Sequence, residues 1–217
     1  MTDIDQTTQP EIAPEMRIYS AAGERLYLTR AERAAFLAAA NQEAPAERMF
    51  CQLLHDTGCR PSEALELAAK GVLLDEGGIV FRTLKKRKQD GRGRMKQAQY
   101  RTVPVSPRLL EKLDLVFSIR TRQKEPGNGI EPLWSMSRPT AYRLVKRVMQ
   151  RAGIEGKQAT GKGLRHGFGV AMVTAARPVP IHVLAKAMGH SSTKTTEVYL
   201  QVIGQEERAL FLGAWDE

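Results

Sequence analysis

Lys162-Gly163-Leu164-Arg165-His166 is the stretch that determines how the rest of this chain is interpreted. Two other stretches carry related side chains: Thr57-Gly58-Cys59-Arg60-Pro61-Ser62-Glu63, and Met188-Gly189-His190-Ser191-Ser192, with Tyr199 nine residues after the histidine. The planar guanidinium of arginine donates two parallel hydrogen bonds to a phosphate and keeps its charge. Two arginines, a histidine and a tyrosine therefore indicate a site that binds and attacks a phosphate, once folding brings them together.

The chemistry of a phosphodiester explains why these residue types are needed. Its negative charge repels nucleophiles, so a catalyst without a metal must neutralise the transition state with cations, here Arg60 and Arg165. A tyrosine titrates at about pH 10 in isolation, and neighbouring cations would help Tyr199 to act near neutral pH. The leaving hydroxyl group must also receive a proton. A lysine from the basic segment between the two expected strands could supply it.

Taken together, these residues resemble the catalytic domain of the tyrosine recombinases, the phage integrase family. The resemblance extends over about residues 26 to 215 and includes the Thr195-Thr196 pair before Tyr199. It implies a DNA strand-exchange enzyme that forms a 3′-phosphotyrosine bond and needs neither metal nor cofactor. The implied roles are nucleophile for Tyr199, phosphate binding for Arg60, Arg165 and His190, site support for Glu63, and a more structural part for His166. The resemblance also places the proton-donating lysine just after the first strand of the hairpin, which favours Lys85, with Lys86 the close alternative.

The sequence departs from the family pattern in two places. The second arginine usually follows a His-x-x-Arg pattern, and here Lys162 occupies the histidine position. Lysine keeps a hydrogen-bond donor there, but its permanent charge does not suit a general base. Most members also carry a helical core-binding domain before the catalytic domain, whereas only about 25 residues precede it in this sequence.

The hydrophobic pattern predicts a mainly helical α+β fold with a small β-hairpin insert. Thr29 and Glu32 form a capping-box pattern at the start of a helix, and Gly58 is expected to end the next one, which runs from about residue 46 to 56. Strands are expected at 79–81 and 100–105. Further helices are expected at 108–117, after Ser137, and at 162–176, 180–188, 193–200 and 206–215, with a loop at 122–132.

Basic side chains gather in two places that are expected to bind DNA. The connection between the two strands is one, and it is rich in charge and in glycine. The helix after Ser137 is the other, because its basic residues lie off the apolar stripe. The predicted DNA-binding residues are Lys86, Arg87, Lys88, Arg92, Arg94, Lys96, Arg143, Lys146 and Arg147.

Composition supports a nucleic-acid partner and an intracellular setting. The chain has 217 residues and a net charge of +9. Residues 1–16 contain four acidic and no basic side chains, so the remaining 201 residues carry 33 basic and 20 acidic ones, a net charge of +13. Such a basic body suits double-stranded DNA. With no secretory signal and no apolar run of membrane length, the chain is expected in the cytoplasm.

Residues 1–24 are expected to form a disordered acidic tail, and residues 25–217 to form the catalytic domain. The cysteines, Cys51 and Cys59, match no metal or redox spacing and are expected to be reduced structural residues. The resemblance implies a homo-oligomer, a tetramer on DNA, assembled through the segment 204–217, with accessory proteins as further partners.

Three functions follow from the sequence. The first is a site-specific recombinase for integration, resolution or inversion. The second is a DNA-binding regulator with little activity of its own, which Lys162 and the absent domain favour. The third is strand relaxation of the type IB topoisomerase kind.

Overall fold

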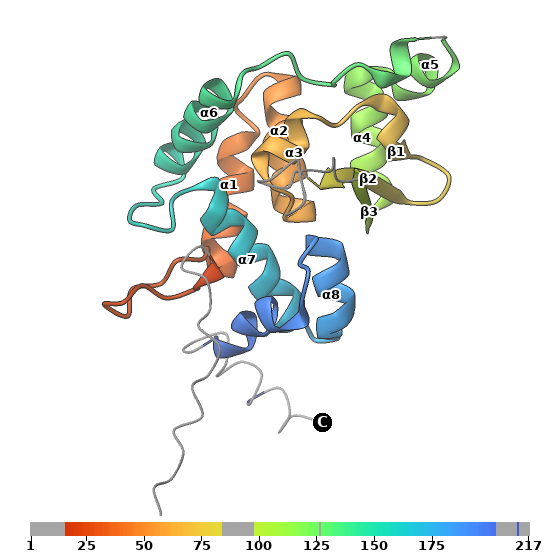
Figure 1. Cartoon of the computed structure of the whole chain (residues 1–217). Coiled ribbons are helices and arrows are strands. Elements are labelled where there is room, and N and C mark those ends of the chain that lie inside the picture. Colours follow the sequence, from red (N-terminus) through yellow and green to blue (C-terminus); the bar gives the residue numbers. More distant parts are fainter. Residues whose placement is uncertain (1–15, 84–97, 126, 203–211, 213–217) are drawn as a thin grey trace, which may run out of the picture.

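A computed structural model describes residues 16–83, 98–125, 127–202 and 212, and it confirms a mainly helical α+β fold with one small sheet (Figure 1). The α-helices of this part of the chain are α1 (Arg30–Ala40), α2 (Pro45–Thr57), α3 (Pro61–Leu65), α4 (Pro107–Phe117), α5 (Ile119–Lys124), α6 (Arg138–Arg151), α7 (Gly161–Val173) and α8 (Ile181–Met188). The 3₁₀-helices are η2 (Ala69–Gly71), η3 (Asn128–Ile130), η4 (Thr193–Thr195) and η5 (Glu197–Gln201).

The sheet contains β1 (Val72–Leu73), β2 (Gly78–Thr83) and β3 (Gln99–Pro104), all antiparallel and in the order β1-β2-β3. Ile79 pairs with Val103 and Phe81 pairs with Arg101, and all four side chains are buried. Successive strand residues point to opposite faces, so Arg101 occupies a position of the buried face together with Val103. The predicted hairpin is confirmed, and the two-residue strand β1 extends it.

Local sequence signals set the helix ends as expected. Thr29 accepts a hydrogen bond from the backbone N–H of Glu32, and the Glu32 carboxylate accepts one from the backbone N–H of Thr29, which is the predicted capping box. Gly58 ends α2 in a left-handed conformation with φ of 58°, a conformation that favours glycine. Ser137 caps α6 by accepting a hydrogen bond from the backbone N–H of Thr140.

Two hydrophobic clusters hold these elements together. The larger one joins helices α1 to α6 and the sheet, and it includes Phe36, Leu53 and Trp134. The smaller one lies at α7, α8 and η5 and includes Phe168, Met188 and Tyr199. Figure 1 shows α7 between the upper helices and the C-terminal elements, and α7 contacts α2 on one side and η5 on the other. Helix α7 therefore connects the two clusters.

Several predicted boundaries differ from the structure. Residues 122–124 belong to α5 and not to a loop, because the apolar residue Ile119 anchors this turn of helix and is fully buried. The short helix expected at 193–200 is present as two 3₁₀-helices, η4 and η5. Residues 16–24, which were predicted to be part of the tail, include the fully buried Ile18 and a bridge between Tyr19 and Arg25. The ordered part of the chain thus begins before residue 25.

Some predictions fall on residues outside the described part of the chain. They are the acidic segment 1–15, most of the basic connection at 84–97, and the helix at 206–215 apart from Leu212. No helix of the described residues has both the length and the apolar character that a membrane span requires.

Candidate active site

Arg165 lies in α7 and brings the three sequence stretches together. One terminal nitrogen of its guanidinium donates to the carbonyl of Gly58, and the other donates to the carbonyl of Met188, each at 2.6 Å. Gly58 lies two residues before Arg60, and Met188 lies two residues before His190. The side chain is 6% exposed, and burial together with the charge of Arg60 lowers the pKa of Arg165 to about 10, which leaves it charged near neutral pH.

Arg60 lies at the N-cap of α3, just before Pro61 begins the helix. Its backbone N–H donates to one carboxylate oxygen of Glu63 at 2.9 Å, and its guanidinium donates to the other at 3.0 Å. The Glu63 side chain has no exposed surface, whereas the Arg60 side chain is 38% exposed. Glu63 therefore holds Arg60 from the buried side and leaves its outer side open to a ligand, and the supporting role of Glu63 stays a prediction.

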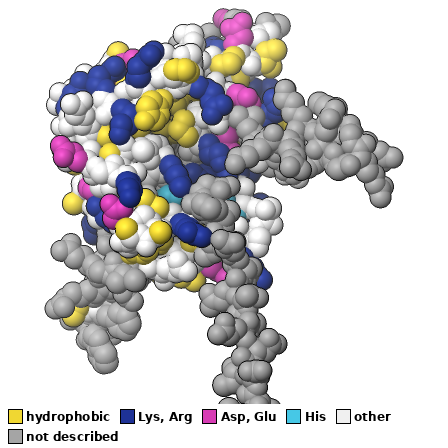
Figure 2. Space-filling model, turned by 60° about the vertical axis from the view of Figure 1, so that its left-hand side comes forward, with side chains coloured by type: hydrophobic (Ala, Val, Ile, Leu, Met, Phe, Trp, Pro, Cys, Tyr) yellow, Lys and Arg dark blue, Asp and Glu magenta, His cyan; other side chains and the backbone are white. Residues whose placement is uncertain are grey.

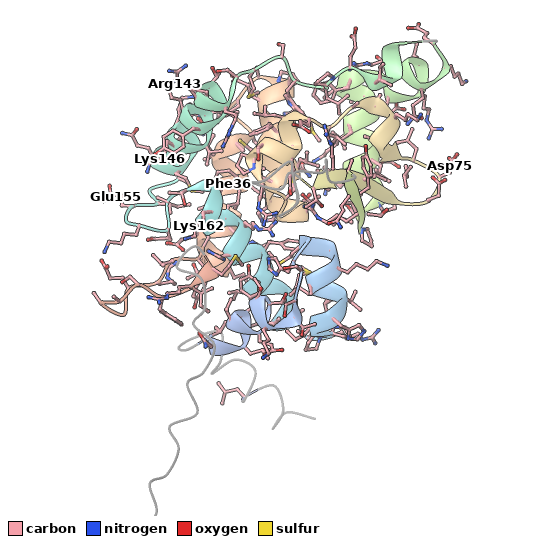
Figure 3. The ribbon with its side chains drawn as sticks, in the orientation of Figure 1. Phe36, Asp75, Arg143, Lys146, Glu155 and Lys162 are labelled. Atoms are coloured by element: carbon pink, nitrogen blue, oxygen red, sulfur yellow. The ribbon has the colours of Figure 1, made fainter. Side chains whose placement is uncertain are left out.

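A cavity of about 490 Å³ opens in front of these groups. Arg60, Lys162, Arg165 and His166 line one part of it, and apolar side chains of α3 and α6 line another. Lys162 is exposed at the start of α7 (Figure 3), so the residue that departs from the family pattern does lie beside both arginines. The cavity combines at least three positive charges with space for a phosphate group.

His190 follows the left-handed C-cap residue Gly189 of α8. A guanidinium nitrogen of Arg165 lies 3.1 Å from its Nε2, and the hydroxyl of Thr196 lies 2.7 Å from its Nδ1. A guanidinium only donates, so Nε2 accepts and the proton of the neutral ring resides on Nδ1, which donates to Thr196. Burial and the charges of Arg165 and Arg60 lower the pKa of His190 to about 3, which keeps the ring neutral.

Tyr199 lies in η5 with 0% of its surface exposed. Its hydroxyl is 3.2 Å from Nδ1 of His166. Its ring stacks on the ring of His190, with the two ring centroids 6.5 Å apart. A Cβ atom on Gly169 would come within 2.5 Å of the phenol ring, so the ring lies directly against the backbone of α7. Burial raises the pKa of Tyr199 to about 12, although Arg165 and Arg60 act in the opposite direction.

The structure thus brings together six of the predicted residues: Arg60, Glu63, Lys162, Arg165, His166 and His190, with Tyr199 beneath them. His166 has a more direct part than expected, because it contacts the phenol oxygen itself. The predicted residues of the basic connection lie outside the described residues, namely Lys85, Lys86, Arg87, Lys88, Arg92, Arg94 and Lys96.

Figure 2 presents a face on which Lys and Arg side chains surround a hydrophobic surface patch, and Figure 3 shows Arg143 and Lys146 on the outer side of α6. Arg147 is paired with Glu43 at 2.6 Å and with Glu47 at 3.1 Å. Lys146 donates to a backbone carbonyl at 3.0 Å, whereas Arg143 is exposed. The charge of Arg147 is therefore partly neutralised within the chain, and DNA binding by these three residues stays a prediction.

Two residues of the site were not identified from the sequence. The hydroxyl of Thr196 is hydrogen-bonded to the ring of His190, and the guanidinium of Arg101 donates a hydrogen bond to the carboxylate of Glu63. A signal for Arg101 was present, because the alternation of 100–105 places a charged residue on the same face as Val103 and Val105. A charged residue at a core-facing strand position needs a buried partner.

The cysteines match their predicted structural role. Both are free and buried, and burial raises the pKa of each thiol to about 12, which makes the reactive thiolate scarce. In the described residues, no three His, Cys, Asp or Glu side chains group in a way that could hold a metal ion.

Comparison with known proteins identifies similar sequences and folds. Residues 26–206 match the model of the phage integrase family. An integrase/recombinase of Escherichia coli is 31% identical, with 72% of this chain and 54% of that protein covered. Tyrosine recombinase XerA of Pyrococcus furiosus is 28% identical, with 72% and 50% covered. The chain therefore spans about half the length of these curated relatives.

Solved structures show the same fold at lower sequence identity. The crystal structure of XerA recombinase aligns with a TM-score of 0.66 at 22% identity, over 87% of this chain and 64% of that one. The catalytic domain of bacteriophage HP1 integrase aligns with a TM-score of 0.56 at 22% identity, over 82% of this chain and 88% of that one.

The contact between Gly169 and Tyr199 predicts that Gly169→Ala destabilises the wild-type protein but stabilises the Tyr199→Leu variant. In the wild type, Gly169→Ala should lower the free energy of unfolding by about 1–3 kcal/mol, because the new methyl group overlaps the phenol ring. With Tyr199→Leu, which removes the outer ring atoms, the same substitution should be stabilising by up to about 1 kcal/mol through helix propensity. Urea denaturation of the four proteins measures both effects, and an equal effect in both backgrounds would contradict the contact.

The pKa of His190 predicts how stability depends on pH. The neutral ring is favoured in the folded state, so the unfolded chain binds one more proton between about pH 6.5 and 3. The contribution of His190 is therefore complete above about pH 6.5 and is lost as the pH falls towards 3. Between pH 7 and pH 4.5, the free energy of unfolding should fall less for His190→Asn than for the wild type. The two slopes should differ by at most about 1.4 kcal/mol per pH unit, the value for one bound proton. Parallel pH curves for the two proteins would refute the assignment.

Proposed function

This chain belongs to the phage integrase family, and on that basis we propose that it cleaves and rejoins double-stranded DNA through a covalent tyrosine–phosphate intermediate. The observation that supports the proposal is the position of Arg165, whose guanidinium hydrogen-bonds to the backbone of the two segments that carry Arg60 and His190. Two similar structures support a DNA partner, because XerH is described as bound to its difH substrate and the Tn1549 integrase as complexed with transposon DNA.

The proposed cleavage step follows from the groups around the cavity. The scissile phosphate would enter between Arg60 and Arg165, with Lys162 at the rim, and these cations would neutralise the charge of the pentacoordinate transition state. The phenol oxygen of Tyr199 would attack phosphorus and release its proton to water. The bond from phosphorus to the 5′-oxygen would break, and Lys85 would give that oxygen its proton.

Rejoining would be the same step in reverse. A 5′-hydroxyl from another strand would attack the phosphotyrosine, the phenol of Tyr199 would leave, and a new phosphodiester would form. The energy of the broken bond would be kept in the ester, so the exchange would need no ATP. Whether the outcome is integration, resolution or inversion would depend on which DNA ends meet.

Tyr199 must move for this reaction. A phenol with no exposed surface does not reach a DNA phosphate, and its raised pKa disfavours the phenolate in its buried position. Movement of η5 towards the cavity would bring the oxygen nearer to the two arginines and lower the pKa by charge. His166, which contacts the phenol oxygen, would hold the residue before DNA arrives.

The burial of Tyr199 is also the observation that favours the second candidate function, a DNA-binding regulator with little activity by itself. In that case the chain would bind DNA and form no covalent adduct. Strand relaxation of the topoisomerase IB kind would give the adduct but no exchanged product. A tetramer formed through residues 204–217, accessory proteins and a cytoplasmic location stay proposals of the same kind.

Replacement of the nucleophile should separate binding from chemistry. Wild-type protein incubated with nicked duplexes of randomised sequence should retain a covalently linked fraction on denaturing gels, and sequencing that fraction gives the preferred site. Tyr199→Phe should form no adduct and should keep its DNA affinity within about twofold, because it loses only one hydroxyl group. Good DNA binding by wild type without any adduct would support the regulator instead.

The general acid can be tested with a modified leaving group. Lys85→Ala should slow cleavage of an ordinary phosphodiester by about 100-fold or more, the usual range for a general acid. A duplex with a 5′-bridging phosphorothiolate should restore most of the rate, because a thiolate leaves without a proton. Lys86→Ala is the matched control and, at saturating protein, should cleave both substrates at nearly the wild-type rate, because weaker DNA binding does not limit the rate there. The opposite result for the two lysines would move the assignment by one residue.

A further inference from the structure

Arg101 is buried in β3 and donates hydrogen bonds to residues of α3, α8 and β2. Its two terminal nitrogens donate to the two oxygens of Glu63 at 2.6 and 3.2 Å. Its Nε donates to the carbonyl of Ala187 at 2.8 Å, and one terminal nitrogen lies 3.4 Å from the hydroxyl of Thr83. The guanidinium also lies over the ring of Phe81, with its central carbon 5.3 Å from the ring centroid. Arg101 thus joins the sheet to α3 and to the end of α8.

The carboxylate of Glu63 is shared between two arginines. Each of its oxygens accepts one hydrogen bond from Arg60 and one from Arg101. Burial acts to raise the pKa of Glu63, but the hydrogen bonds and charge of Arg101, helped by Arg60, hold it below its usual value. A buried carboxylate of this kind has a full negative charge that its neighbours must compensate.

The close approach of Arg101 also affects the residue before His190. A Cβ atom on Gly189 would lie 3.1–3.2 Å from three atoms of the Arg101 side chain, and Gly189 has φ of 67°. The end of α8 therefore packs directly on the guanidinium and receives its hydrogen bond at Ala187. The position of His190, which follows this turn, depends on the same side chain.

Arg101 does not reach a DNA phosphate itself. Its side chain is 4% exposed, and each of its three nitrogens already donates within the chain. Arg60, in contrast, is 38% exposed and lines the cavity. Arg60 can therefore contact a ligand in the cavity, whereas Arg101 can act only on other residues of the site.

We infer that Arg101 is a positioning residue for the proposed cleavage step, because it compensates the charge of Glu63 and so leaves the guanidinium of Arg60 available to the scissile phosphate. Without Arg101, the whole charge of Glu63 would act on Arg60 and draw its guanidinium away from the cavity. The inference rests on the proposed function, since it concerns how that reaction is arranged.

The test compares cleavage rates at saturating protein with DNA affinity, on the duplex recovered from the randomised pool. Arg101→Met should form the covalent adduct about 10- to 100-fold more slowly, with an affinity within about threefold of wild type. Arg82→Met is the matched control, because Arg82 lies on the neighbouring strand in a loose pair with Glu66 and its side chain is 55% exposed. It should cleave within about twofold of wild type.

A second substitution distinguishes positioning from a general structural role. Glu63→Gln removes the charge but keeps an acceptor for the backbone N–H of Arg60. If Arg101 acts by compensating Glu63, the double variant Arg101→Met with Glu63→Gln should cleave faster than Arg101→Met alone, by about tenfold. A double variant that is as slow as the single variant or slower would overturn the inference, as would a wild-type rate for Arg101→Met.

Arg101→Lys covers the case in which the methionine variant does not fold. Its ammonium keeps the charge but cannot span both oxygens of Glu63 and the carbonyl of Ala187, so cleavage should slow by about 3- to 10-fold at unchanged affinity. A wild-type rate for this variant would also overturn the inference. The absence of any adduct with wild-type protein would instead refute the proposed function.

Discussion

The hydrogen bonds from Arg165 to the carbonyls of Gly58 and Met188 are the constraint on which the site depends. A buried guanidinium needs acceptors on every side, and here the acceptors are backbone groups of the two segments that carry Arg60 and His190. Folding therefore satisfies a buried charge and assembles the proposed phosphate site at the same time. The side chain that would bind the phosphate also holds the site together.

A second layer of charge surrounds this arrangement. Arg60 and Arg101 share the carboxylate of Glu63, so one negative group lies among three arginines. Such a network keeps the guanidinium groups close together although they repel each other. Arg60 and Arg165 also line the cavity, where the proposed phosphate would interact with them.

The position of Tyr199 shows how packing controls the proposed nucleophile. The ring lies against Gly169 and among the apolar residues of the smaller cluster, and its hydroxyl contacts His166. Burial makes the phenol hard to ionise, although two arginines lie near enough to favour the phenolate. This packing would hold the proposed nucleophile beside the site, and attack on DNA would require η5 to leave it.

Local patterns in the sequence determined most of the fold and indicated most residues of the candidate site. The capping box at Thr29, the stop at Gly58 and the alternation of 100–105 depend only on near neighbours, so they could be predicted. The residues Arg60, Glu63, Arg165, His190 and Tyr199 were found because each lies in a distinctive short motif. Only the tertiary structure showed that Arg101 bonds Glu63, 38 positions away along the chain, that His166 contacts the phenol, and that Tyr199 is buried. Such contacts depend on how α7, α8 and the sheet pack, because the energy of a buried charge is set by the partners that folding brings to it.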